Sequence, residues 1–197
     1  VAKEMPDADT SLTSLAAKQV DLVHTTALTA SRSRQEGVTN AVELLSQEYE
    51  CLIPNMNHMP MNDKRMREAI ICAIDRKAII TELYLGHAFS ADSPIPPDSF
   101  LFDSTQTQHE YNPGRATTLL GELGFSDTDA DGLLEREGYD FKINLLVAEN
   151  AVQNTRADVA QLIIEQLATV GLECELSVKS WDEYVKALND GEFDLAL

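Results

Sequence analysis

Alternating carboxylates between residues 127 and 135 form the pattern in this sequence that is most typical of a metal site. Asp127, Asp129 and Asp131 precede a glycine, and Glu135 follows. Alternating carboxylates before a glycine turn supply the hard oxygen ligands that calcium prefers. A full EF-hand loop has a bidentate glutamate at its twelfth position, which here is Gly138. The pattern therefore predicts either a structural Ca²⁺ site, with Glu135 as an imperfect substitute, or a solvated acidic turn.

The cysteines and histidines do not form a recognisable catalytic or zinc motif. The three cysteines, Cys51, Cys72 and Cys174, lie far apart, without CxxC or Cys/His zinc spacing. We expect them to be small buried side chains, although one disulfide plus one free thiol stays open. The four histidines lie outside any HExxH sequence, and the chain has no G-x-S-x-G, P-loop or GxGxxG motif.

The charge of the chain excludes two classes of partner. Asp and Glu number 33 against 15 Lys and Arg, which gives a formal net charge of −18. Nucleic acid and anionic lipid both require a cationic surface, so we expect neither as a partner. The sequence also contains no continuous apolar run of the roughly 18 residues that a membrane-spanning helix needs.

Periodicity in the last third of the chain predicts alternating strands and helices. Apolar residues alternate over 139–147, 172–178 and 193–197, which predicts three strands. Helical spacing covers 155–170, ended by Gly171, and 181–188, ended by Gly191. Strands that alternate with helices favour right-handed crossovers, so we expect an α/β fold with a largely parallel sheet flanked by helices.

The earlier elements are predicted from caps and apolar spacing. Asn62 or Asp63 caps a helix predicted to run through Tyr84, and Asn112 caps a helix over 113–123. We further expect a helix over 7–19, short strands at 20–23 and 49–56, and a surface loop over 25–39.

Six segments occur together in an order that is specific to one protein family. They are NHMPMNDKRMREA at 57–69, AIDRKAII at 73–80, PIPP at 94–97, YNP at 111–113, GF with DADG at 124–132, and WDEY with GEFD at 181–194. Residues 49–197 resemble the extracellular solute-binding proteins of the peptide/nickel type, which are the receptors of oligopeptide and dipeptide ABC importers. Residues 1–48 fit the same family more loosely.

The resemblance implies a fold, a function and a location. The family's fold is two α/β lobes that close on a ligand like a clamshell, and residues 1–197 would form a single lobe, the C-terminal one. Because the chain begins at Val1 and ends in an apolar run, we expect a fragment of a longer receptor, without its signal segment. The implied function is capture of peptides or a similar small solute for an ABC permease in the membrane. We expect a monomer without a required cofactor, in the periplasm or as a cell-surface lipoprotein.

Three residues are candidates for contact with the solute. Trp181 follows a predicted strand, and the matching tryptophan of the family lines the ligand pocket. The carboxyl end of a strand in an open α/β sheet is also where crevices form. Asn154 and Thr155 begin the helix after the preceding strand, where free backbone amides can hold a carboxylate or a carbonyl. The alternatives are a packing role for Trp181 and simple helix capping by Asn154 or Thr155.

Two other functions stay open from the sequence. A receptor of this fold can act as a cell-surface sensor or adhesion module without transport. A hydrolase would require a nucleophile and a base close to Trp181, and the sequence shows no such pair. We therefore expect a binding protein and not an enzyme.

Overall fold

The computed structural model describes residues 4–33, 42–44, 48–96, 99–103, 105, 109–149 and 155–197. The chain divides into two compact units, the first made of Val1–Glu48 with Ile80–Phe89 and the second of Tyr49–Ile79 with Ser90–Leu197. Among the described residues, no helix is both long and apolar enough to cross a membrane. The prediction that residues 1–197 form a single lobe stays a prediction.

The first unit contains α1 (Ala8–Ala16) and α2 (Ala27–Ser33). Asp7 caps α1, because its Oδ1 accepts a hydrogen bond from the Thr10 amide at 2.6 Å. The predicted helix over 7–19 is therefore confirmed, with an earlier end. α2 lies where the sequence predicted only a surface loop, and the structure corrects that interpretation for residues 27–33.

The predicted strand over residues 20–23 is wrong. These residues have no regular secondary structure apart from a bend at Asp21, and they pair with no strand among the described residues. Leu22 is largely exposed to solvent. Alternation alone cannot form a strand, because backbone N–H and C=O groups need a partner strand.

The second unit is built on a four-stranded sheet in the order β1-β7-β5-β6. Its strands are β1 (Ile53–Pro54), β5 (Lys142–Ala148), β6 (Glu173–Lys179) and β7 (Leu195–Ala196). β5 pairs in parallel with both β6 and β7, whereas β1 pairs antiparallel with β7 at the edge. The predicted α/β fold with a largely parallel sheet is confirmed, although the strand predicted over 49–56 is reduced to β1.

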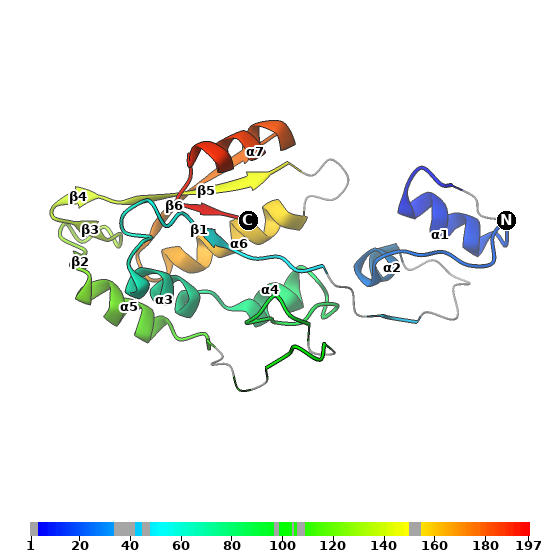
Figure 1. Cartoon of the computed structure of the whole chain (residues 1–197), viewed down its shortest axis with the longest axis horizontal. Coiled ribbons are helices and arrows are strands. Elements are labelled where there is room, and N and C mark those ends of the chain that lie inside the picture. The colour runs from blue at the N-terminus through cyan, green and yellow to red at the C-terminus, as the bar shows by residue number, and fades with distance from the viewer. Residues whose placement is uncertain are drawn as a thin grey trace. The chain divides into compact units, whose positions relative to one another are not determined.

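Helices cover both faces of this sheet (Figure 1). α7 (Trp181–Asp190) packs on one face, where its Tyr184 and Ala187 contact Leu146 and Ala148 of β5 in one buried cluster. α6 (Thr155–Ala168) lies on the other face, and α3 (Lys64–Ala73) and α5 (Pro113–Glu122) pack beyond it (Figure 1). Residues 145–148 of β5 are apolar and buried in an unbroken run, and because side chains alternate along a strand, this part of β5 is apolar on both faces.

The single strand predicted over 139–147 is two strands in two sheets. β4 (Tyr139–Asp140) belongs to a small antiparallel sheet with β2 (Phe125–Ser126) and β3 (Glu135–Arg136), and β5 begins only at Lys142. Phe141 lies between them, and its ring packs edge-on against Phe125 with the centroids 5.3 Å apart. This aromatic contact lies where the chain passes from one sheet to the other.

The helix predicted from residue 63 to residue 84 is also two helices, α3 and α4 (Arg76–Glu82). Ile74 ends α3 in an extended conformation, with φ −98° and ψ 116°. Asp75 then caps α4, since its Oδ1 accepts hydrogen bonds from the amides of Lys77 and Ala78. The Gln166 side chain of α6 accepts a hydrogen bond from the Asp75 amide at 2.9 Å, so a contact far along the chain stabilises the break.

Gly171, which ends the turn after α6, offers a test of this packing. Its φ is +81°, and a Cβ at this position would lie 2.7 Å from Cγ of Leu134. We expect Gly171→Ala to lower the free energy of unfolding by about 1–3 kcal/mol, because left-handed backbone strain and a steric clash would add. Urea unfolding followed by circular dichroism measures this change.

Gly121→Ala is the matched control. Gly121 lies inside α5, and apart from the neighbouring backbone of its own helix no atom lies within 4 Å of its added Cβ. There the same substitution should raise the free energy of unfolding by about 0.5–1 kcal/mol, since alanine favours a helix over glycine. Equal effects of the two substitutions would contradict the described packing of Gly171.

Candidate functional site

The carboxyl ends of β5 and β6 meet at one edge of the main sheet. The amide of Glu149, just after β5, donates a hydrogen bond to the carbonyl of Lys179 at the end of β6, at 2.7 Å. Two of the predicted solute-contacting residues follow these strands, because Thr155 begins α6 and Trp181 begins α7. Asn154 lies outside the described residues. This edge, with the first turns of α6 and α7, is here called the carboxyl edge.

Trp181 and Tyr184 form an aromatic pair at the carboxyl edge. Their rings are stacked, with centroids 5.7 Å apart and an angle of 23° between the planes. Trp181 is 62% exposed, whereas Tyr184 is only 7% exposed and donates its phenol to the carbonyl oxygen of Leu197 at 3.3 Å. The buried tyrosine therefore supports an exposed indole face. Tyr184 was not among the residues predicted to contact the solute, although its i, i+3 spacing from Trp181 carries the signal.

A capping box holds the start of α7 in place. The carboxylate of Glu183 accepts hydrogen bonds from the backbone amide and the hydroxyl of Ser180, at 3.2 and 2.7 Å. These bonds lower the pKa of Glu183, the hydroxyl contributing most. The residue immediately after this cap is Trp181, so the orientation of the indole depends on a well-defined helix start.

The first turn of α6 contributes polar groups to the same edge. The hydroxyl of Thr155 is buried and has no hydrogen-bond partner within the described part of the chain. The next residue, Arg156, donates from Nε to Oε1 of Glu50 at 3.1 Å. A cation in the first helical turn is disfavoured by the helix dipole, which is the signal that could have singled out Arg156 in the sequence. Its partner Glu50 could not have been identified from local spacing.

The cysteines differ from the expectation of three buried side chains. All three are free thiols, and Cys72 is buried, Cys174 is half-buried and Cys51 is exposed. Burial raises the pKa of the Cys174 thiol to about 12, so this group stays protonated. Burial also raises the pKa of the Tyr184 phenol. Smaller electrostatic effects come from Arg156, which lowers this pKa, and from Cys51, which raises it. Cys51 lies just before the short edge strand β1, where few neighbours cover it.

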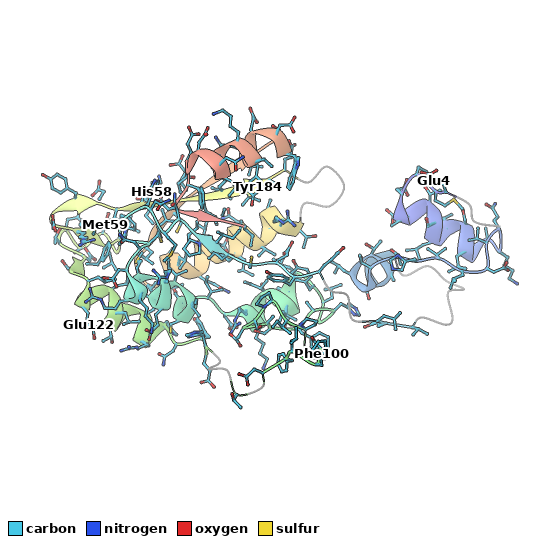
Figure 2. All side chains as sticks on the ribbon, in the orientation of Figure 1. Glu4, His58, Met59, Phe100, Glu122 and Tyr184 are labelled. Atoms are coloured by element: carbon cyan, nitrogen blue, oxygen red, sulfur yellow. The ribbon has the colours of Figure 1, made fainter. Side chains whose placement is uncertain are left out.

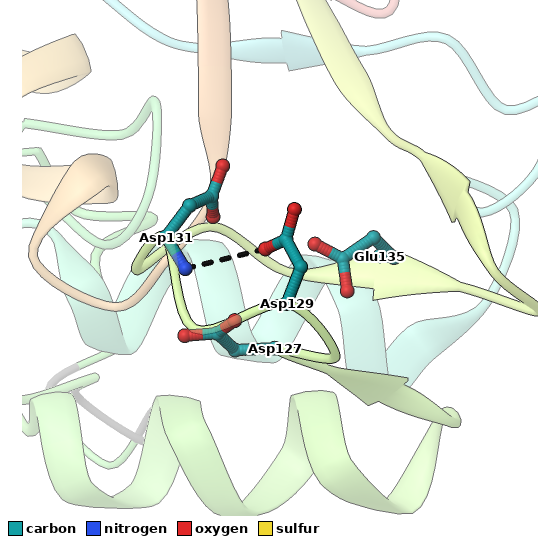
Figure 3. A group of neighbouring side chains, drawn as sticks. All are labelled: Asp127, Asp129, Asp131 and Glu135. Carbon is teal, nitrogen blue, oxygen red and sulfur yellow. Dashed lines mark hydrogen bonds between the residues drawn. The ribbon is translucent and has the colours of Figure 1, made fainter.

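The acidic loop between β2 and β3 brings all four predicted carboxylates together (Figure 3). One ligand oxygen from each of Asp127, Asp129, Asp131 and Glu135 can be chosen so that all lie within 4.8 Å of one another. The three aspartates are exposed, whereas Glu135 is buried. Oxygen ligands at this spacing fit a hard divalent cation such as calcium.

The same carboxylates also organise the loop by themselves. Asp127 accepts hydrogen bonds from the amides of Ala130 and Gly132, at 2.7 and 3.0 Å. Glu135 accepts from the amide and hydroxyl of Thr128, at 2.6 and 2.5 Å. These bonds also fit a solvated acidic turn, so calcium binding stays a prediction.

A surface hollow of about 290 Å³ lies away from the carboxyl edge, at the start of α3 and the end of α5. Figure 2 labels Met59 and Glu122 on its rim. Arg65 forms hydrogen bonds to both carboxylate oxygens of Asp63, which lowers the pKa of Asp63 to about 2, and Arg65 also donates to the carbonyl of Glu122. Because these charges are already paired, the hollow is less suited to a small solute than the exposed indole is.

The fold agrees with comparison to known proteins. The whole chain, residues 1–197, matches the bacterial extracellular solute-binding proteins, family 5 middle, and the chain belongs to this family. It is 27% identical over 194 residues to the oligopeptide-binding protein AppA of Bacillus subtilis. That alignment covers 98% of this chain and 35% of AppA, so the chain spans about a third of the relative's length.

Solved structures of related proteins share the fold. The structure of AppA from Bacillus subtilis in complex with a nonapeptide superposes with a TM-score of 0.77 at 25% identity, covering 98% of this chain and 38% of that one. A nickel ABC transporter from Bacillus halodurans superposes with a TM-score of 0.78 at 22% identity, covering 96% and 39% of the two chains. This second likeness supports the α/β architecture alone.

Calcium binding by the acidic loop can be tested by thermal unfolding. A cation that binds only the folded loop stabilises it by mass action, and 1 kcal/mol corresponds to about 2–4 °C for a chain of this size. We expect millimolar CaCl₂ to raise the melting temperature of the wild type by a few degrees and that of Asp129→Ala by less. Asp140→Asn, an exposed acid outside the loop, should keep the full shift. An equal shift in all three proteins, or none in the wild type, would contradict a calcium site.

Proposed function

We propose that this chain binds a peptide or a similar small solute at its carboxyl edge, as part of the receptor of an ABC importer. The observation that carries the proposal is the exposed face of Trp181, supported by a buried tyrosine at the carboxyl ends of parallel strands. Family membership over the whole chain supports the same role, as does the likeness to AppA, whose solved structure holds a nonapeptide.

The chemistry of the carboxyl edge suits peptide better than a bare ion. An indole face can stack on side chains or on the planar peptide backbone. The Thr155 hydroxyl and the first amides of α6 can bond to a carbonyl or a terminal carboxylate, and Arg156 adds a positive charge that Glu50 partly neutralises. Binding of this kind needs no catalytic step, so solute capture does not require an enzyme.

The proposal includes a location and partners for the whole receptor. Members of an extracellular solute-binding family act outside the cytoplasm, and we propose the periplasm or a lipid-anchored place at the cell surface. The membrane partner would be an ABC permease that receives the solute. A net charge of −18 is compatible with a monomer that stays in solution by self-repulsion. Any calcium in the acidic loop would stabilise that loop and have no role in transport.

Solute binding by this chain should be weak. The chain corresponds to 35% of AppA, so in a receptor built like AppA many ligand contacts would come from residues outside this sequence. A dissociation constant of roughly 1 mM corresponds to only about 4 kcal/mol of binding free energy, which one aromatic contact with a few hydrogen bonds could supply. Calorimetry that gave micromolar affinity for the 197-residue chain would contradict this division of the ligand surface.

Saturation-transfer NMR with tetra-alanine tests the role of Trp181, because the method detects weak binding from signals of the peptide. We expect transfer to the peptide with the wild type and a loss of at least half of it with Trp181→Ala. Tyr139→Ala is the matched control, since Tyr139 is also an exposed aromatic side chain but lies on β4, in the other sheet. Equal transfer in both variants, or no transfer in the wild type, would contradict the proposal.

A further inference from the structure

Ser31, His87 and Glu43 form a chain of polar contacts in the first compact unit. Oγ of Ser31 lies 2.6 Å from Nε2 of His87, and Nδ1 of the same imidazole lies 3.2 Å from Oε1 of Glu43. The serine and the carboxylate thus contact opposite nitrogens of one ring. Ser31 belongs to α2, and His87 follows it by 56 residues, so local sequence spacing gives no sign of the group.

The order of the three groups determines where the protons lie. The negative charge of the Glu43 carboxylate beside Nδ1 favours the neutral tautomer of His87 that carries its proton on that nitrogen. The lone pair on Nε2 then faces the hydroxyl of Ser31 and can take its proton. The negative charge of Glu43 stabilises the imidazolium that this transfer would form. Nucleophilic serine hydrolases arrange a serine, a histidine and a carboxylate in this order.

The Ser31 hydroxyl is oriented differently from the hydroxyls of two threonines in α5. Thr117 and Thr118 of α5 each donate to a carbonyl one turn back, at 3.0 and 2.9 Å, as hydroxyls inside helices commonly do. The hydroxyl of Ser31 instead contacts the imidazole. The side chains of His87 and Glu43 are 23% and 63% exposed, and Ser31 is half-buried, so a small reagent can reach the group from solvent.

We propose that Ser31 is an activated nucleophile that accepts an acyl group from small activated esters, with His87 as the general base and Glu43 as the group that orients it. Oγ of Ser31 bonds to the ester carbonyl carbon while its proton passes to Nε2 of His87. The ester C–O bond breaks, and the departing alcohol oxygen takes that proton. Water then attacks the acyl-serine with His87 again as base, which releases the carboxylic acid and restores Ser31. Ser31 belongs to the first unit and Trp181 to the second, and this reaction uses no residue of the carboxyl edge.

Labelling with a fluorophosphonate probe tests the nucleophile directly. Oγ of Ser31 would bond to phosphorus, the P–F bond would break, and fluoride would leave as the proton moves to His87. We expect one adduct per chain by intact mass, located at Ser31 by peptide mapping. General-base catalysis contributes about 10²–10⁴-fold, so His87→Gln should slow labelling by at least about 100-fold. Ser31→Ala should abolish labelling, and Glu43→Gln should slow it by a smaller factor.

Ser11→Ala is the matched control in the same unit. In the wild type, the Ser11 hydroxyl donates to the carbonyl oxygen of Asp7 at 2.9 Å and contacts no histidine in the described structure. Labelling of the Ser11→Ala variant should therefore equal that of the wild type. Circular dichroism melts establish that each variant is folded. Should Ser31→Ala unfold, Ser31→Cys provides a second test, because iodoacetamide should alkylate the new thiol at a rate that falls when His87 is also replaced. An unlabelled wild type, adducts at other serines only, or labelling that is indifferent to His87→Gln would overturn the proposal.

Discussion

Strand β5 lies in the middle of the second unit's sheet, between β7 and β6, and helices cover both of its faces. Its side chains Ile143, Leu145, Leu146 and Val147 are completely buried. Each such side chain stabilises the fold by about 1.5–3 kcal/mol relative to an exposed one. Because β5 is paired in parallel on both sides, each return of the chain passes through a helix, and the carboxyl ends of β5 and β6 lie at one edge. The position of the candidate site therefore follows from the burial of one strand.

Local sequence signals correctly predicted the alternating strands and helices from β5 to β7. The strict alternation of apolar residues identifies β6, and the glycines at positions 171 and 191 mark where α6 and α7 end. These signals depend only on residues close together in the sequence. The failures involve distant contacts. The break between α3 and α4 depends on Gln166, and the separation of β4 from β5 on the packing of Phe141 against Phe125. Alternation over 20–23 predicted a strand that has no partner, since pairing cannot be judged from one segment.

The candidate sites show the same division between local and distant signals. The acidic loop was predicted correctly as a cluster because its four carboxylates lie within nine residues, from Asp127 to Glu135. Trp181 was placed correctly at a strand end, whereas the contact of Arg156 with Glu50 joins residues that are 106 positions apart. The Ser31–His87 contact was missed for the same reason. A hydrolase was expected to need a nucleophile and a base near Trp181, whereas the Ser31–His87 contact lies in the other unit.

The central claim, that solute binds at the carboxyl edge of the parallel strands, can be tested by photo-crosslinking. A tetrapeptide that carries a benzophenone side chain would be irradiated with the chain, and the adducts would be located by tandem mass spectrometry. Benzophenone reacts only with groups that it touches, so we expect adducts in the first turns of α6 and α7, above all at Trp181. An excess of unlabelled peptide should prevent these adducts from forming. Competed adducts confined to the hollow between α3 and α5, or to the acidic loop, would contradict it.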